Sequence, residues 1–175
     1  YKERVKFLNE LTPVFNNYYS EISDGKENVS LDYKSQLNDN MLDILIKQSK
    51  TRDRITSSTQ VGIHKDDIIF KMNTYPIKKI GSQGQQKSFL ISLKLAQFDF
   101  ISKQLGFKPI LLLDDIFDKL DDIRILKLIK FVNKKVFGQV FITDTQKKRS
   151  EDILKAAGIN FDIFITRNGN IIKNE

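Results

Sequence analysis

Residues 110–115 read ILLLDD, four apolar residues followed directly by Asp114 and Asp115. A short, continuous apolar run is typical of a strand in a parallel sheet whose two faces are both covered. Helical patterns precede and follow this run, and a second apolar strand at 140–142 comes after the next helix. Because strand–helix–strand repetition favours parallel strands joined by right-handed crossovers, the sequence predicts an α/β fold with a mostly parallel sheet.

The two aspartates are expected at the carboxyl end of the 110–113 strand, where open α/β sheets bind ligands. In phosphoryl-transfer enzymes such an acid holds Mg²⁺, and a neighbouring acid can orient or deprotonate water. The alternative is that these acids cap a helix, a role that suits Asp. A cap accounts for one aspartate but not for a pair followed by Asp118 and Asp121, so we favour a site for phosphoryl transfer.

The alternation of strands and helices continues after the acidic pair. An Asn-Gly pair between apolar runs is the strongest short signal for a hairpin. We therefore expect a helix from Asp121 that ends before Gly138, a buried strand at 140–142, a helix at 147–157 stopped by Gly158, and a hairpin around Asn168 and Gly169.

A polar turn, GSQGQQ at 81–86, precedes a helix expected to run to about Leu105 and to stop at Gly106. Glycine lets the backbone approach a ligand closely, and a helix N-terminus favours anions. A capped turn without a ligand is the equally open alternative. The helix is apolar nearly all round, so we expect it to be buried.

The first 80 residues predict helices and short strands. We expect a helix over 1–22 that Pro13 kinks or restarts, a half-buried strand at 29–33, a helix capped near Asn38–Asn40 that runs to Arg54, and a hairpin over 67–77 with Pro76 on an edge strand. The basic residues near the end of the second helix suit the helix dipole, and a phosphate-contacting stripe is the alternative.

The composition fits a globular domain, with 40% hydrophobic and 29% charged residues. A net charge of +7 favours polyanionic partners, nucleic acid first. No apolar run approaches the roughly 20 residues that span a bilayer, so we do not expect this protein to be an integral membrane protein. The chain has no cysteine, which excludes disulfides and thiolate metal sites and fits a cytoplasmic setting.

The 81–86 turn and the acidic pair, about 30 residues apart and joined by a helix, resemble the signature and Walker B motifs of ABC-type ATPases. The strings SQGQQ at 82–86, LLLDD at 111–115 and KLD at 119–121 are similar to the RecF family of DNA replication and repair proteins, relatives of the SMC ATPases. GIHKDD at 62–67 resembles that family's GPHRDD element, with Ile63 in place of proline, and GQVFIT at 138–143 resembles its switch strand.

This resemblance covers nearly the whole chain, since residues 11–37 are similar to the middle region of the family. It implies the C-terminal portion of an ABC-type (P-loop NTPase) ATPase head. Residues 1–56 would be part of the helical arm, or lobe II, and residues 57–175 the C-terminal part of the head.

The resemblance also implies a composite ATP site, in which the signature of one protomer closes over the γ-phosphate held by another. By position, Asp114 would organise Mg²⁺, and Asp115 would stand where many ABC ATPases have a catalytic Glu; the shorter side chain suits slow turnover. Asp121 would belong to the D-loop, and Thr143 stands where many relatives carry a switch histidine. The signature residues facing the nucleotide, or supporting those that do, would be Ser82, Gln83, Gly84, Gln85 and Gln86.

A Walker A loop, Gly-x-x-x-x-Gly-Lys-Ser/Thr, does not occur in the sequence. The chain begins at Tyr1, already within a helical pattern, and it therefore reads as a fragment of a longer protein. We expect the fragment alone to bind ATP weakly or not at all, and the complete parent protein to be an ATPase.

The preferred hypothesis is an ATP-dependent switch that dimerises on ATP to clamp double-stranded DNA and releases it on hydrolysis. The resemblance adds DNA gap junctions, the mediators RecO and RecR, and recombinase loading at gaps. The basic residues expected to contact DNA phosphates are Lys47, Lys50, Arg52, Arg54, Lys78 and Lys79.

Two alternatives remain open. One is a metal-dependent nuclease that uses Asp114, Asp115 and Asp118, and the other is a structural interaction domain whose acids cap helices. The role of His64, the only histidine, is also open between a hydrogen-bonded loop residue and a nucleotide contact.

Overall fold

The computed structural model describes residues 1–117, 120–133 and 137–174. The chain separates into two compact units, Tyr1–Gln97 and Phe98–Glu175, and the boundary falls inside one long helix. The expected boundary between residues 56 and 57 concerns the lobes of a complete ATPase head and stays a prediction. Asp118 and Lys119, which the sequence singled out, lie outside the described residues.

The first unit begins with helix α1, Lys2–Ser23, whose apolar residues recur at helical spacing and form much of this unit's core. The helix is uninterrupted, so the predicted restart at Pro13 does not occur. It ends where Asp24 and Gly25 adopt left-handed backbone conformations and the Gly25 N–H donates to the carbonyl of Ser20 at 2.9 Å.

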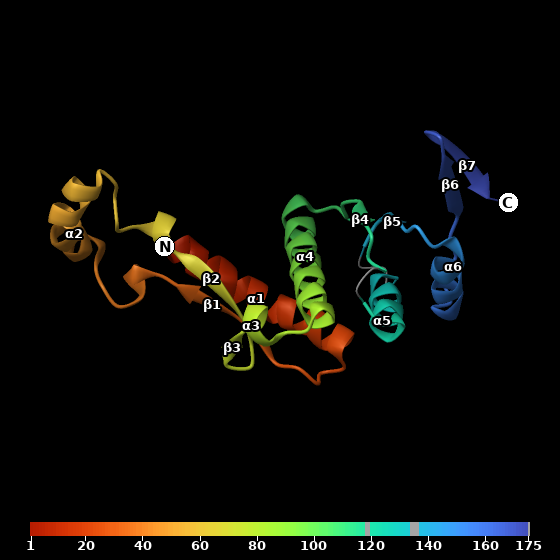
Figure 1. Cartoon of the computed structure of the whole chain (residues 1–175), viewed down its shortest axis with the longest axis horizontal. Coiled ribbons are helices and arrows are strands. Elements are labelled where there is room, and N and C mark those ends of the chain that lie inside the picture. Colours follow the sequence, from red (N-terminus) through yellow and green to blue (C-terminus); the bar gives the residue numbers. More distant parts are fainter. Residues whose placement is uncertain (118–119, 134–136, 175) are drawn as a thin grey trace. The chain divides into compact units, whose positions relative to one another are not determined.

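The first unit also contains three strands: β1 (Val29–Lys34), β2 (Asp67–Met72) and β3 (Tyr75–Pro76). They form an antiparallel sheet in the order β1-β2-β3, which confirms the predicted 67–77 hairpin and the edge position of Pro76. The pairing of β1 with β2 joins residues about 40 positions apart. Figure 1 shows α1 running alongside this pair, and α1 contacts β1.

The second helix, α2, spans Leu42–Thr56, after a 3₁₀ turn, Gln36–Asn38. The predicted cap at Asn38–Asn40 is wrong, because Met41 is the N-cap residue and makes no side-chain capping bond. None of the α2 residues is buried. The helix therefore has no core of its own within the described chain.

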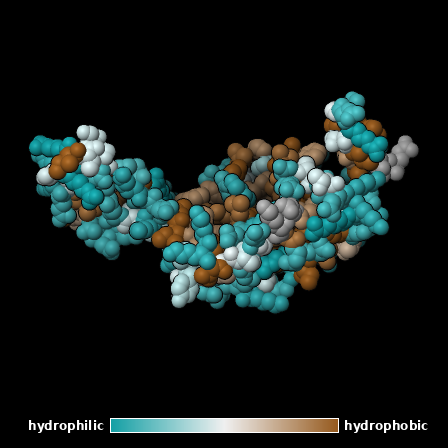
Figure 2. All heavy atoms as spheres, viewed as in Figure 1, coloured by the Kyte–Doolittle hydropathy of each residue, from teal (hydrophilic) through white to brown (hydrophobic). Residues whose placement is uncertain are grey.

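Helix α3 (Ile77–Ile80) leads into helix α4 (Gln83–Leu105), which ends at Gly106 with φ +72°, as predicted. Only one stripe of α4 is buried, centred on Phe89, which packs against Phe15 of α1 with ring centroids 4.7 Å apart. The prediction of a fully buried α4 is wrong for the described chain, since Leu90 on the opposite face is 54% exposed. Figure 2 shows hydrophobic side chains reaching the surface over α4.

The buried stripe of α4 also contains Ser92, whose hydroxyl is fully buried without a hydrogen-bond partner in the described part of the chain. An unsatisfied buried hydroxyl costs free energy, and alanine is the better helix former. We expect Ser92→Ala to raise the free energy of unfolding of the complete protein by about 1 kcal/mol. Urea denaturation followed by circular dichroism measures this change. A loss of stability would show that the hydroxyl has a partner in the complete protein.

The second unit contains a parallel pair of strands, β4 (Leu111–Leu113) and β5 (Val140–Ile142), with helix α5 (Asp122–Val132) between them. Helix α6 (Lys147–Ala156) and the antiparallel hairpin β6 (Ile163–Arg167) and β7 (Asn170–Asn174) follow. These elements confirm the predicted alternation, including a hairpin turn at Asn168 and Gly169, both with positive φ.

The β4–β5 sheet is covered on one face only in this chain. Leu111 and Leu113 are buried, whereas Leu112 is 70% exposed and is paired in register with the exposed Phe141. The prediction of a sheet covered on both faces is therefore wrong for the described residues. None of the described helices combines the length and the apolar character needed to cross a bilayer.

Candidate functional site

The acidic pair, Asp114 and Asp115, directly follows β4, at the carboxyl end of the parallel sheet. Thr143 directly follows β5, and its backbone N–H donates to the carbonyl of Leu113 at 3.0 Å. The parallel register thus carries Thr143 to the same sheet edge as the two acids. Both aspartates are exposed at this edge, where a ligand can reach them.

The Thr143 hydroxyl connects the two aspartates. It donates a hydrogen bond to Oδ1 of Asp114 and accepts one from the backbone N–H of Asp115 at 3.2 Å. Oδ2 of Asp114 has no protein partner in the described part of the chain. Since Mg²⁺ prefers oxygen ligands and usually takes one or two carboxylates, these donors fit a magnesium ion.

Asp115 has a left-handed backbone, with φ +49°. Residues other than glycine rarely adopt this conformation, and strained backbones of this kind cluster at functional sites. The bond from its N–H to Thr143 helps to hold the turn.

Asp121 has the capping role that the sequence left open. It is the N-cap of α5, and its carboxylate accepts from the Arg124 N–H at 2.8 Å and lies 3.4 Å from Arg124 Nε. The pair Asp114 and Asp115 caps no helix that the structure describes. Capping therefore explains Asp121 but not the acidic pair.

Arg149 of α6 contacts Phe117, Leu120 and Asp122, three described residues that lie between the acidic pair and the first turn of α5. Its guanidinium donates to the carbonyls of Phe117 and Leu120, at 3.0 and 3.4 Å, and pairs with Asp122 at 2.7 Å. The sequence reasoning missed Arg149, because a single arginine in a basic amphipathic helix carries no local pattern that marks it.

The predicted signature residues lie in the first unit, at the start of α4. Ser82 caps this helix: its Oγ accepts from the Gln85 N–H at 3.2 Å, and Oε1 of Gln85 accepts from the Ser82 N–H at 2.8 Å. This reciprocal pair is a capping box. The Ser82 carbonyl accepts from Gln86, whereas the N–H groups of Gln83 and Gly84 meet no acceptor in the described part of the chain.

The turn before the cap is tightly packed. Gln86 Nε2 donates to the carbonyl of Gly81 at 2.8 Å. A Cβ on Gly81 would lie 2.8 Å from both the carbonyl oxygen and Cγ1 of Ile77, so only glycine fits there without movement of the backbone. Ser82 and Gln83 are exposed, and Gly84, Gln85 and Gln86 are half-buried.

The predicted DNA-contacting residues are all exposed and belong to the first unit. On α2, three of them share one face at the spacing i, i+3, i+7, and we name Lys47, Lys50 and Arg54 the basic stripe. Arg52 lies on the other side of the helix by the same geometry. Lys78 and Lys79 form a separate basic group on α3.

The element with the only histidine, residues 62–67, is held to α1. Arg4 donates to the carbonyl of Ile63 at 2.5 Å, and the exposed His64 ring lies 3.1 Å from the carbonyl of Thr59. The Asp66 side chain is 1% exposed and accepts from the Tyr33 hydroxyl. Burial alone would raise the pKa of Asp66, but hydrogen bonds from Tyr33 and Ser35 and the charge of Arg4 outweigh it and lower the pKa.

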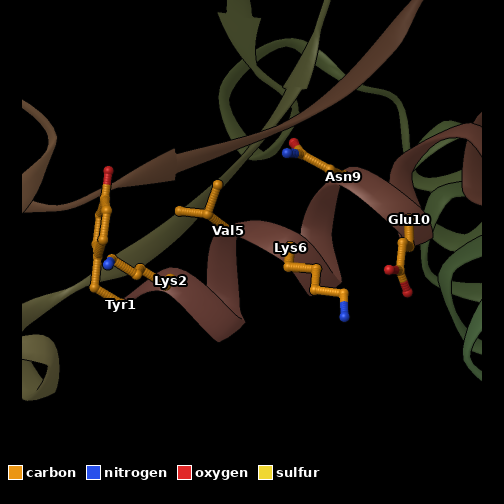
Figure 3. Close-up of a pocket in the computed structure, with 6 residues that line it drawn as sticks. All are labelled: Tyr1, Lys2, Val5, Lys6, Asn9 and Glu10. Carbon is orange, nitrogen blue, oxygen red and sulfur yellow. The ribbon is translucent and has the colours of Figure 1, made fainter.

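Burial, followed by the hydrogen bond to Asp66, raises the pKa of Tyr33. This buried network holds the loop in place, and the hydrogen bond of His64 goes to the Thr59 carbonyl, which is not one of the predicted site groups. A shallow, open hollow on this unit lies along the first turns of α1, has a volume of about 370 Å³ and is lined by both polar and apolar side chains (Figure 3). Among the described residues, no group of three or more His, Cys, Asp or Glu side chains forms a metal-binding cluster.

A parallel strand pair with two acids at its carboxyl edge and a long helix capped by a serine are both elements of half an ABC/SMC-type ATPase head. The fold is shared with the crystal structure of the Smc head bound to the C-winged helix domain of ScpA, with a TM-score of 0.60 over 97% of this chain at 13% identity. Two solved structures of the recombination mediator protein RecF, one with ATP, match more closely: 25 and 26% identity, TM-scores of 0.70 and 0.68, and 99 and 98% of this chain against 46% of theirs.

The curated relatives carry one name. The chain is 49% identical over 164 residues to the DNA replication and repair protein RecF of Flavobacterium johnsoniae and 46% identical over 171 residues to that of Azobacteroides pseudotrichonymphae. These matches take in 94 and 98% of this chain. The chain belongs to the RecF family and corresponds to the C-terminal half of its members. It spans about half the length of the curated relatives, 46 and 47%, and no family model matches it.

Proposed function

We propose that this chain is the C-terminal part of an ATP-dependent DNA-binding switch that acts in cytoplasmic DNA replication and recombinational repair. Residues 1–56 belong to its helical lobe and residues 57–175 to the ATPase head. The complete protein hydrolyses ATP, and the half that this chain does not span supplies the Walker A loop. The family membership and the position of the acidic pair support this proposal.

The observation that carries the proposal is the pair of hydrogen bonds between the Thr143 hydroxyl and the acidic pair. Asp114 is the ligand that organises Mg²⁺, because its Oδ2 is available while its Oδ1 is fixed by the Thr143 hydroxyl. Asp115 orients or deprotonates the attacking water, and Asp121 lies in the D-loop. Thr143, at the place of a switch histidine, orients Asp114. When it is bound, Mg²⁺ neutralises charge on the phosphates of ATP.

The start of α4 suits the second role, binding the triphosphate held by a partner copy. Within the described chain, the N–H groups of Gln83 and Gly84 are unpaired donors at the positive end of a 23-residue helix. Ser82 Oγ already accepts a bond, so its hydroxyl proton remains to donate to a phosphate. Gln85 and Gln86 support the turn. ATP therefore joins two copies into a dimer with the signature of each facing the nucleotide of the other.

The DNA surface that we propose includes the basic stripe of α2, with Arg52, Lys78 and Lys79 as further phosphate contacts. No carboxylate in the described chain lies within salt-bridge distance of Lys47, Lys50 or Arg54. Their charge is thus available to a polyanion. The dimer closes on double-stranded DNA and gap junctions, and recombination mediators of the RecO and RecR type bind the DNA-bound state.

The test uses the complete protein, with and without ATP, on fluorescent duplex DNA at several salt concentrations. Each phosphate contact contributes about 0.9 to the slope of log K against log salt. Replacing Lys47, Lys50 and Arg54 by Gln should reduce the magnitude of this negative slope by about 2.7 and weaken binding to two unrelated sequences equally.

The matched control replaces three exposed lysines of α5 and α6, Lys130, Lys148 and Lys155, by Gln and should leave the slope unchanged. An equal loss in the two triple variants would mean that net charge, not the stripe, binds DNA. DNA binding without any dependence on ATP would contradict the switch, and cleavage of the duplex in Mg²⁺ would favour the nuclease.

A further inference from the structure

The capping box at the start of α4 is connected to α1 through Glu27, which lies in the turn between α1 and β1. Gln85 Nε2 donates to Oε1 of Glu27 at 3.0 Å, although 58 positions separate the two residues. The other carboxylate oxygen of Glu27 accepts from the hydroxyl of Tyr19. A continuous chain of hydrogen bonds thus joins Tyr19, Glu27, Gln85 and Ser82.

The bond to Glu27 selects one orientation of the Gln85 amide. In the observed orientation Oε1 faces the Ser82 N–H and Nε2 faces a carboxylate. A flipped amide would place an oxygen against the carboxylate and an NH₂ group against the Ser82 N–H, so both bonds would be lost. A hydrogen bond to a charged acceptor is also stronger than one between neutral groups.

The far end of the chain of hydrogen bonds is anchored in the core. Tyr19 is fully buried on α1, and its ring lies 6.0 Å from that of Phe89. Phe89 also contacts Phe15, and it follows Gln85 by about one turn of α4. The same faces of α1 and α4 therefore fix both the tyrosine hydroxyl and the start of the helix that carries the capping box.

We propose that Glu27 is a positioning residue for the phosphate-binding turn: it fixes the amide of Gln85, and through it the backbone of Ser82, Gln83 and Gly84. The inference rests on the proposed function, in which this turn faces the nucleotide of a second copy. Because Tyr19 belongs to α1, a shift of α1 reaches the turn through Glu27. The position of α1 and ATP-dependent dimerisation are therefore coupled.

The test exchanges the two partners in the complete protein. Glu27→Gln removes the charge and brings two amides together, and Gln85→Glu brings two carboxylates together. In the double variant, the amide now at position 27 donates to the carboxylate now at position 85, which still accepts from the Ser82 N–H. Each single variant should raise the dimer dissociation constant at saturating ATP about tenfold, and the double variant should restore it to within about threefold of the parent value.

Two measurements separate this inference from the proposed function. Sedimentation velocity gives the dimer constant, and amide hydrogen exchange of residues 82–86 in the ATP-free protein needs no nucleotide. Exchange of the hydrogen-bonded amides of Ser82, Gln85 and Gln86 should become about tenfold faster in each single variant and recover in the double variant. Glu10→Gln, the same change on the exposed side of α1, is the control and should alter neither.

The outcomes are distinct. Unchanged exchange and an unchanged dimer constant in both single variants overturn the role of Glu27. Changed exchange without recovery in the double variant also overturns it, because the loss then reflects general destabilisation. If the exchange pattern is as expected but ATP does not dimerise the parent protein, Glu27 positions the turn and the proposed function fails.

Discussion

Asp114→Asn in the complete protein is expected to reduce ATP turnover about 100-fold at saturating ATP and Mg²⁺, which corresponds to about 2.7 kcal/mol. The amide keeps an oxygen that can accept from the Thr143 hydroxyl, so the local structure should survive. It lacks the negative charge that Mg²⁺ prefers. Phosphate release, measured over a range of Mg²⁺ concentrations, gives the loss, and part of the activity should return at high Mg²⁺.

The matched control is Asp152→Asn, which makes the same change at an exposed position of α6 in the same unit. Its turnover should equal that of the parent protein. If Asp114→Asn turns over ATP at the parent rate, the carboxyl edge of β4 and β5 does not hold the metal. The acids would then have only a structural role.

Gln83→Glu is expected to weaken the ATP-dependent dimer about 100-fold without loss of folded-state stability. Gln83 is exposed in the first turn of α4, where an added negative charge interacts favourably with the helix dipole. The same charge would face the triphosphate held by the partner copy. Like charges that face each other cost several kcal/mol, so the dimer should become weaker although the folded protein becomes slightly more stable.

Gln104→Glu is the control for this experiment, because it places the same charge in the last turn of the same helix. There the dipole interaction is unfavourable, so a small loss of stability is expected together with normal dimerisation. Thermal melting and sedimentation at saturating ATP measure the two quantities. A Gln83→Glu protein that dimerises normally would show that the turn does not face a nucleotide.

Local patterns in the sequence predicted most elements of the second unit. The strands at 111–113 and 140–142, helices α5 and α6, and the Asn168-Gly169 hairpin are where the apolar periodicity and turn residues indicate. Patterns of this kind depend only on residues a few positions apart, and so they can be recognised in a single sequence. The predicted cap of α2 failed because Asn38 and Asp39 end a 3₁₀ turn instead of opening the helix, which begins after Met41.

The predicted burial of α4 and of both faces of the β4–β5 sheet failed for a different reason. An apolar pattern records that a face is covered in the complete fold, but not which part of the protein covers it. The described chain leaves Leu90 and Leu112 exposed, and its curated relatives are about twice as long. We propose that the part of the parent protein outside this chain covers these faces.

The sequence by itself determined the residue types of the site: the adjacent acids after an apolar strand, and the serine and glutamines at the start of a helix. Only the tertiary structure decided which side chains hold them. Thr143 reaches Asp114 because parallel strands end at one sheet edge, and Glu27 reaches Gln85 because α1 packs on α4. Such contacts join residues tens of positions apart, and their energies depend on distances and orientations that only packing sets.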